Sequence, residues 1–302
     1  MPETAPDPMT TASEDIRVVA AESPLRDVMG GASRWEVPVH EHGFVALVDS
    51  MPRLVPEGQT ADQAIVQAAR VSYGHGTRKV HEDRGLIRYL MRHRHTTPFE
   101  MIEFKFHVAM PMFIARQWIR HRTANVNEYS ARYSIVPDRF YRPSVENIRE
   151  QSRSNRQGGD DPVDIGTAEA FLAYLERTES HYAEYEQMLE KGVSRELARI
   201  GLPVSAYTQW YWKCDLHNIF HFLSLRMDPH AQQEIRDFAN AMYALIKTIV
   251  PVACEAFEDY RLGGMHLTSL EIEALRTGEP LATENRREQA EWEAKRARLG
   301  IE

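Results

Sequence analysis

The sequence has few cysteines, no long apolar run and no excess of positive charge. Its 302 residues include only Cys214 and Cys254, which rules out a disulfide framework and is too few for a zinc site built from thiolates. No apolar run reaches the roughly 18 residues of a membrane span. Residues 1–15 lack the charged-then-apolar pattern of a signal peptide. We therefore expect a cytoplasmic protein with no membrane partner.

The net charge argues against one broad class of function. The chain carries a formal charge of −8, whereas a general nucleic-acid binder needs a basic face that displaces counterions. We expect no nucleic-acid partner. A local basic cluster in such an acidic chain favours a small anionic ligand instead.

The composition predicts one large catalytic domain with two appendages. A hydrophobic fraction of 43% supports a substantial core. Residues 1–38 are rich in Pro, Ser, Thr and acidic residues, and we expect a loosely ordered N-terminal extension. Residues 39–278 form the predicted domain, with an exposed polar loop near 152–166. Residues 279–302 are charged and Ala-rich, typical of a solvated helical tail.

Hydrophobic periodicity predicts an α+β fold, with a mixed or antiparallel sheet and a large helical component. The run from Gly43 is expected to be the first strand, and strict alternation over 102–108 predicts a half-buried strand. A third strand is possible at 206–214. Helices are expected over 61–72, 82–94, 111–122, 167–192, 194–203, 215–227 and 230–250. Capping signals are a Thr60–Gln63 capping box, Pro111, Gly192 and Asp228–Pro229.

The segment 115–134, "ARQWIRHRTANVNEYSARYS", concentrates positive charge, amides and hydroxyls. On a helix, Arg116, Gln117 and Arg120 would lie on one side. Cations near a helix C-terminus offset the helix dipole, which is a sufficient structural reason for Arg120. The continuation through Ser130 and Arg132 has little to bury, and arginine with serine suits a phosphate. The residues alone leave anion binding and a solvated loop equally open.

Three other clusters have structural and functional interpretations. His93 and His95 alternate with arginines, which is typical of a basic helix end and a poor chelate. His217 and His221 have a metal-compatible spacing but lack a glutamate after the first histidine. With Asp215 they leave open a metal-dependent nucleotide hydrolase. The sequence shows no lowered thiol pKa for either cysteine, so a cysteine nucleophile is not expected.

Several motifs resemble one known family. "RHR" at 120–122 is followed by seven residues and Ser130, which resembles the signature of the flavin-dependent thymidylate synthases. "HTTPFE" at 95–100, "ARQW" at 115–118, "RELARIGLP" and "HFLSLRMDPHAQQEI" also resemble that family's motifs, and the resemblance covers roughly residues 42–260. It implies the conversion of dUMP to dTMP, with 5,10-methylenetetrahydrofolate as carbon donor and NADPH-reduced FAD as hydride source. It also implies an α+β fold and a homotetramer with active sites between subunits.

The resemblance carries functional residues to matching positions. Those that it places at FAD are Ser72, Thr97, Arg120, His121, Arg122, Glu128, Asp215, Leu216, His217 and His221. Those that it places at the nucleotide are Gln117, Trp118, Ile119, Arg120, Glu128, Tyr129, Ser130, Ala131, Arg132, Arg199 and Arg226. No metal is implied.

Three of the matching residues are predicted to be catalytic. Arg226 matches an arginine that holds the uracil and helps ionise N3, and His95 matches a histidine implicated in folate or hydride steps. Ser130 occupies the family's serine position. Attack and ligand holding both remain open for it, and holding is favoured because no histidine or lysine base adjoins it. A nucleotide sensor without catalysis is a further alternative.

This sequence departs from some family members in one segment. At 215–217 and at His221 those members have asparagine and arginine. A histidine in place of arginine weakens a permanent positive charge beside the flavin.

Overall fold

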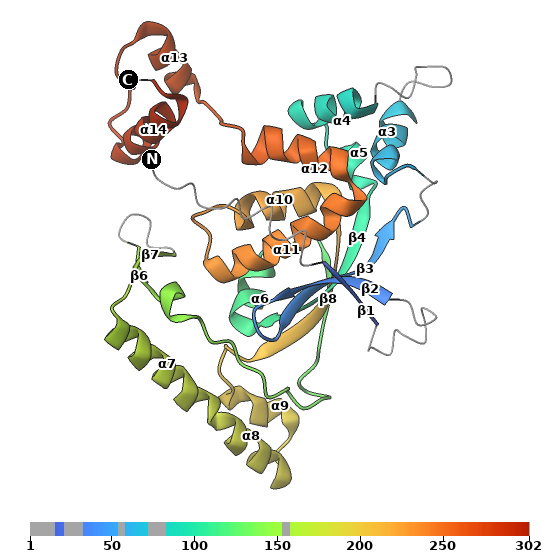
Figure 1. Ribbon diagram of the computed structural model, residues 1–302, viewed down its shortest axis with the longest axis vertical. Helices are drawn as coiled ribbons and strands as arrows, with labels where there is room; N and C mark the ends of the chain where they lie inside the picture. The colour runs from blue at the N-terminus through green and yellow to red at the C-terminus, as the bar shows by residue number, and fades with distance from the viewer. Residues whose placement is uncertain (1–15, 21–32, 54–57, 72–82, 153–157, 302) are drawn as a thin grey trace. The chain divides into compact units, whose positions relative to one another are not determined.

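The computed structural model describes residues 16–20, 33–53, 58–71, 83–152 and 158–301. The chain forms two compact units, which meet in sequence between Cys254 and Glu255. The first unit contains the sheet and most of the helices (Figure 1). The boundary falls before residue 279, where the composition suggested that the tail begins.

The first unit is built on a six-stranded sheet whose described pairs are all antiparallel. In spatial order the strands are β1 Arg17–Ala20, β2 Ser33–Val39, β3 Gly43–Met51, β4 Glu103–Pro111, β8 Tyr207–Asp215 and β5 Asn125–Glu128. The α+β prediction is confirmed. The prediction that Gly43 opens the first strand is wrong, because residues 17–20 and 33–39 of the expected extension already pair as strands.

One face of the sheet carries the core. Phe104 and Phe106 on β4 are fully buried, and Phe106 pairs with the buried Trp212 of β8. The alternation over 102–108 is confirmed, because Lys105 on the opposite face is only half-buried. The helices against the core face are α6 Met112–Trp118, α10 Leu216–Arg226 and α11 Gln233–Ile249. Trp118 of α6 stacks on a ring of α10, which fixes these two helices against each other.

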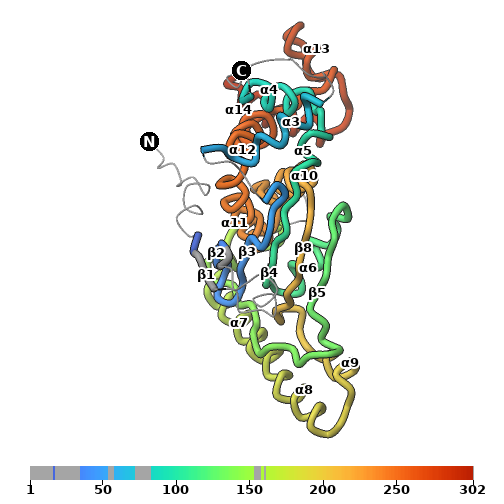
Figure 2. Tube along the Cα trace, turned by 90° about the vertical axis from the view of Figure 1, so that its right-hand side faces the viewer, coloured from blue at the N-terminus to red at the C-terminus, as the bar shows by residue number. Residues whose placement is uncertain are grey.

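Two groups of helices of the first unit lie beyond opposite ends of the sheet (Figure 2). At one end are α3 Asp62–Val71, α4 Asp83–Arg92 and α5 Thr97–Glu100. At the other are α7 Ile165–Glu179, α8 His181–Glu190, α9 Arg195–Ala198 and the 3-10 helix η3 Arg199–Gly201. The helices expected over 61–72, 82–94 and 194–203 are confirmed within one or two turns.

Several helix boundaries differ from the predictions. The helix expected over 167–192 is two helices that meet at Ser180, although Gly192 ends the second one in the left-handed conformation, with φ of 86°. The helix expected to start after Asp228–Pro229 starts at Gln233, because the Asp228 carboxylate accepts a hydrogen bond from the His230 amide in a separate turn. The second interruption is a local turn at Asp228, whereas the break at Ser180 lies between two stretches of helical sequence.

Two further local predictions are corrected. The Thr60 hydroxyl donates to the Asp62 carboxylate, 2.8 Å away, rather than forming a capping box with Gln63. The segment 152–166, predicted as a polar loop, contains the strand β7 Gly159–Pro162, which pairs antiparallel with β6 Arg149–Gln151. A short 3-10 helix, η2 Val145–Asn147, precedes it.

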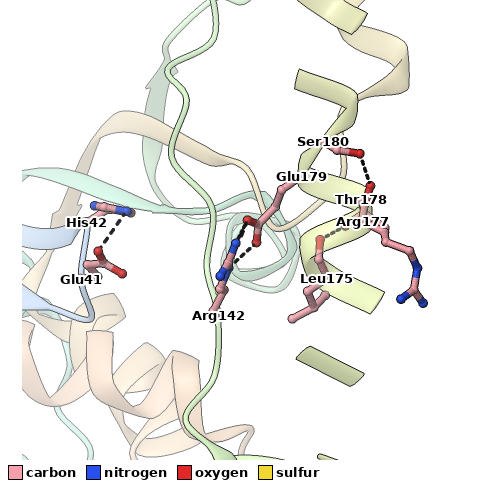
Figure 3. Close-up of polar contacts among 8 residues, drawn as sticks. All are labelled: Glu41, His42, Arg142, Leu175, Arg177, Thr178, Glu179 and Ser180. Atoms are coloured by element: carbon pink, nitrogen blue, oxygen red, sulfur yellow. Dashed lines mark hydrogen bonds and ion pairs between the residues drawn. The ribbon is translucent and has the colours of Figure 1, made fainter. Parts of the chain in front are cut away.

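An ion pair attaches α7 to the loop that follows Ser130. Figure 3 shows Arg142 facing Glu179 near the end of α7. The guanidinium Nε lies 2.9 Å from Oε1 and Nη2 lies 2.5 Å from Oε2, and this pairing raises the pKa of Arg142. Nearby, the Tyr182 hydroxyl of α8 donates to the Val136 carbonyl, 2.7 Å away. The helices α7 and α8 therefore support the backbone just beyond the basic segment.

The second unit is a small helical structure. It begins within α12 Pro251–Phe257 and contains η4 Glu258–Leu262, α13 Ser269–Thr277 and α14 Arg286–Leu299. Thr268 and Glu271 form a capping box at α13, Lys295 of α14 lies 2.7 Å from the Glu271 carboxylate, and Trp292 is buried. The expected helical tail is thus part of a folded pair of helices. None of the helices in the described ranges is long and apolar enough to cross a membrane.

Candidate functional site

The basic segment begins where α6 ends. Trp118 is the last helical residue, and its indole is fully buried. The chain then turns, because the Arg120 amide donates to the Gln117 carbonyl at 3.3 Å and the His121 amide to the Trp118 carbonyl at 2.9 Å. The helix predicted through Arg122 therefore stops four residues early. The turn leaves the Arg120 side chain exposed and His121 half-buried.

His121 meets the C-terminal end of α10. The Nε of Arg226, the last residue of α10, donates to Nε2 of His121 at 3.1 Å. The His121 ring also lies 5.0 Å from the Phe222 ring and 5.8 Å from the His221 ring. Burial, with Arg226 and His221 nearby, lowers the pKa of His121 to about 4. At neutral pH the imidazole is therefore uncharged and able to accept this hydrogen bond.

The arginines of the candidate site share one electrostatic property. Among the described residues, no carboxylate pairs with Arg120, Arg122, Arg132, Arg199 or Arg226, whereas Arg17, Arg53, Arg70, Arg142 and Arg276 each pair with one. Burial lowers the pKa of Arg226, which shows that its charge is partly removed from water. These guanidinium groups, which lack carboxylate partners, lie beyond the two ends of the short strand β5 Asn125–Glu128. Together they form a positive region that suits an anionic ligand.

A glutamine pair adjoins this end of α6. The Gln117 side-chain amide donates to the Oε1 of Gln232, the N-cap residue of α11. Gln117 comes from the segment with the family resemblance, while Gln232 was not predicted. The two lie far apart in sequence, and no local signal connects them.

A second group of predicted residues lies beyond the other end of β5. Glu128, the last residue of β5, accepts a hydrogen bond from the Thr208 hydroxyl at 2.7 Å. Thr208 was not predicted, because only the β5–β8 pairing brings it there. Ser130 and Arg132 follow in a turn, and Ala131 is buried in the cluster that includes Ala206 and packs against α9 and η3.

The same turn is linked to Arg199. Arg195 on α9 donates to the Tyr133 carbonyl, 2.7 Å away, and α9 continues directly into η3, where Arg199 is half-buried. The structure therefore brings the Ser130 turn and the segment of Arg199 to one region. No hydrogen bond or ion pair within the described ranges joins this group to His121 and Arg226.

The environment of Ser130 bears on its role. Its Oγ accepts a hydrogen bond from the Arg132 amide at 3.4 Å. Across the described residues, no histidine, lysine or carboxylate is hydrogen-bonded to this hydroxyl. A serine nucleophile needs an adjacent base, so the geometry favours ligand holding.

The first turn of α10 contains the predicted flavin contacts that depart from the family pattern. Asp215 is the N-cap of α10, and its carboxylate accepts hydrogen bonds from the Asn218 amide at 2.9 Å and from the Asn218 side chain at 2.8 Å. A helix explains the aspartate here without a ligand. His217 is half-buried and His221 exposed on the same helix.

The segment of His95 and Thr97 packs beside α10. The helix α5 begins at Thr97 and contacts α10, and the Leu216 amide donates to the Ile102 carbonyl at 2.8 Å. The side chains of His95 and Thr97 are exposed, and the His95 ring lies 5.8 Å from the Tyr89 ring. Ser72, also predicted at FAD, lies outside the described residues.

Two predicted contacts are corrected for their side chains. Trp118 and Leu216 are fully buried in the core. Trp118 stacks on Phe222 at 4.6 Å, so its side chain supports the turn that carries Arg120 rather than facing a ligand. Ile119 and Tyr129, by contrast, are exposed.

Comparisons with known proteins identify the family. The family described as "Thymidylate synthase complementing protein" matches residues 53–252. A flavin-dependent thymidylate synthase from Dictyostelium discoideum is 66% identical over 284 residues, which are 94% of each chain. The chain belongs to the flavin-dependent thymidylate synthase family. A synthase from Gluconobacter oxydans is 54% identical over 82% of this chain and 81% of its own.

A solved structure agrees with this assignment. The crystal structure of a UMP/dUMP methylase, PolB, from Streptomyces cacaoi bound with 5-Br dUMP superposes with a TM-score of 0.64 at 35% identity. It covers 74% of this chain and 98% of the PolB chain. This chain therefore shares most of its fold with PolB.

The donor set fits a flavin that carries phosphates. Arg120 and Arg122 are exposed and unpaired by carboxylates in the described ranges, and arginine binds phosphate oxygens with its fork of donors. The described residues contain no group of three histidines, cysteines or carboxylates arranged to hold a metal ion.

Both cysteines of the chain have a structural environment. Both are buried. The Cys214 thiol donates to the Thr123 carbonyl, 3.1 Å away, and burial together with Asp215 raises its pKa. A thiol with a raised pKa is a poor nucleophile at neutral pH.

Proposed function

We propose that this cytoplasmic protein converts dUMP to dTMP, with 5,10-methylenetetrahydrofolate as carbon donor, FAD as hydride carrier and NADPH as reductant. One observation supports this most strongly: Arg226 is half-buried, has no carboxylate partner in the described part of the chain, and is held by an uncharged histidine. A desolvated cation in that position suits a neutral ring on which negative charge develops.

The nucleotide is held from both ends of β5 in this proposal. Arg132, Arg199 and Ser130 bind the phosphate, because arginine and hydroxyl donors match its oxygens. Gln117, whose amide is oriented by Gln232, and the exposed Arg120 contact the rest of the nucleotide. The proposed nucleotide site also includes Ile119, Glu128, Tyr129 and Ala131.

Arg226 faces the uracil. Loss of the N3 proton leaves negative charge on the ring, and a fixed guanidinium stabilises that charge without reorganising. A charged ring is more nucleophilic at C5, the position that accepts the carbon. The protein needs no covalent cysteine for this step, which agrees with the burial of Cys214.

In this proposal the turn after α6 and the first turns of α10 would hold the flavin. The residues that would contact it are Thr97, Arg120, His121, Arg122, Glu128, Asp215, Leu216, His217 and His221. The family resemblance adds Ser72, which lies outside the described residues. When bound, FAD supplies the hydride, and the protein supplies binding and orientation. His95 is exposed on the loop before α5, and we propose that it meets the folate.

The proposed enzyme is a homotetramer whose active sites lie between subunits. A strand of four residues, about 13 Å long at about 3.3 Å per residue, separates the Arg226 group from the Ser130 group. Tyr133, Leu197, Ile200 and Val204 around the second group are largely exposed. Such a concentration of exposed apolar side chains is typical of a subunit interface, and a second copy would complete each half of the site.

Flavin binding tests the proposal directly. Purified protein should be yellow or should take up added FAD, and the flavin absorbance should bleach when NADPH is added under anaerobic conditions. An intact tetramer that binds no flavin would refute the proposal. Activity lost on treatment with a strong chelator would point instead to a metal-dependent hydrolase that uses His217 and His221.

A further inference from the structure

The hydrogen bond between His121 and Arg226 joins two motifs that are 105 residues apart. Arg226 is the last residue of α10. The Arg226 Nε donates to His121, and no other described residue accepts a hydrogen bond from the two terminal nitrogens of Arg226. Those terminal nitrogens form the fork that a planar ligand edge would meet.

The imidazole is itself fixed. The Phe222 ring lies 5.0 Å away at an interplanar angle of 77°, and the His221 ring lies 5.8 Å away on the same helix. Nε2 must carry the lone pair to accept from Arg226, so the proton of the neutral ring is on Nδ1. Its pKa of about 4 keeps the ring in this form at neutral pH.

From this geometry we infer that His121 is a positioning residue, which acts through Arg226 to aim its terminal nitrogens at the pyrimidine ring. The inference rests on the proposed function, because it assigns to His121 a role toward the nucleotide in addition to any contact with the flavin. It also requires that the acceptor be at the position of Nε2, and not merely that a polar side chain be present.

Two substitutions separate these requirements. His121→Gln places an amide oxygen near the position of Nε2, while His121→Asn has the same chemistry but is one methylene too short to reach Arg226. Both are measured in the wild-type background and in Arg226→Lys, which keeps the charge but lacks the Nε donor. The dissociation constant of dUMP is measured by calorimetry with the FAD-loaded protein, and FAD content is measured separately for each variant.

His121→Asn should raise the dissociation constant roughly tenfold, the loss expected for a hydrogen bond to a charged group, and His121→Gln should restore most of it. In the Arg226→Lys background, His121→Asn should change the constant less than about twofold, because the bond is already gone. Turnover at saturating dUMP should fall with the same pattern across the variants.

Equal losses from His121→Asn in both backgrounds would overturn the inference, and so would a His121→Gln variant as weak as His121→Asn. A wild-type protein that takes up FAD but does not bind dUMP would instead overturn the proposed function. The two failures are therefore distinguishable in one set of titrations.

Discussion

At the scale of single residues, the site is defined by charges that lack partners. Arg226 is half-buried and its only described side-chain bond is to His121. A surface arginine such as Arg276, which lies 2.6 Å from Glu273, has its charge satisfied within its own helix. This difference predicts that Arg226 contributes to turnover and that Arg276 does not.

Replacing Arg226 tests this difference. Arg226→Ala should lower turnover by about 100-fold or more, because a fixed charge near a developing anion typically contributes on that scale, while the unfolding midpoint stays close to that of the wild type. Steady-state kinetics and urea denaturation are the measurements. Arg276→Ala is the matched control and should keep full turnover. A variant of Arg226 with half of normal activity would contradict the assigned role.

Arg132 should behave differently from Arg226. It is exposed and lies in the Ser130 turn, where the proposal has it bind the phosphate in ground state and transition state alike. Arg132→Ala should raise the Michaelis constant for dUMP by about tenfold or more and change turnover less. A variant that loses turnover with an unchanged Michaelis constant would be inconsistent with phosphate holding.

The sequence predicted which residues bear charge but not how they are paired. The spacing of "RHR" and Ser130 is visible in the chain, and so is Arg226 at the end of an apolar helix pattern. The His121–Arg226 bond and the Gln117–Gln232 bond depend on how α6 packs against α10 and α11. The family resemblance assigned Trp118 to the nucleotide, whereas the packing of aromatic rings buries its side chain.

At the scale of elements, Asp62 joins the start of α3 to the start of α12. Its carboxylate accepts hydrogen bonds from the Ala253 amide at 2.8 Å, the Val252 amide at 3.1 Å and the Thr60 hydroxyl at 2.8 Å. Burial of the carboxyl is the main cause that raises its pKa, and these hydrogen bonds only partly oppose it. At neutral pH the buried charge of Asp62 lowers the free energy of unfolding, and an uncharged acceptor at this position would avoid that loss.

The direction of the pH effect follows from the raised pKa. The folded protein keeps the Asp62 proton at pH values where the unfolded chain has lost it, so the free energy of unfolding falls as pH rises from about 4 through the folded-state pKa. Asp62→Asn keeps an acceptor oxygen but cannot ionise, and it should remove this fall. Urea denaturation between pH 4.5 and 7 measures it.

Asp164 supplies a control of opposite sign. It caps α7 through the Thr167 amide and hydroxyl, and these bonds lower its pKa. Its contribution is present above the unfolded-state pKa of about 4 and is lost as pH falls below it. Asp164→Asn should therefore remove a rise in stability below pH 4 and leave the profile between pH 4.5 and 7 unchanged. An Asp62→Asn variant with the wild-type pH profile would show that the buried carboxyl does not titrate as described.

Alternating strands were more predictable than helix ends. The β4 pattern puts Phe104 and Phe106 on one face by itself, and the sheet confirms it. The break at Ser180 and the start of α11 at Gln233 have no comparable signal, because α7, α8 and α11 each continue good helical sequence on both sides of the boundary. Strands β1 and β2 were missed because they lie in a polar, Pro-containing region.

At the scale of the whole molecule, the proposed site needs two subunits. This predicts complementation between variants that are each defective in one half. Arg226→Ala and a combined Arg132→Ala, Arg199→Ala variant should each be nearly inactive at low dUMP. Co-expressed and purified as mixed tetramers through two different tags, they should recover measurable activity, because some sites then contain both intact halves. Mixed tetramers as inactive as either parent would place the two groups in one subunit.

The central claim is that the protein forms dTMP by flavin-dependent chemistry. The most direct measurement is release of tritium from dUMP labelled at C5, with and without NADPH and 5,10-methylenetetrahydrofolate, using the FAD-loaded protein. We predict tritium release that depends on bound flavin and that accompanies dTMP formation when both co-substrates are present. A protein that binds FAD and dUMP but releases no tritium under any of these conditions would be a nucleotide sensor, and that result would contradict the claim.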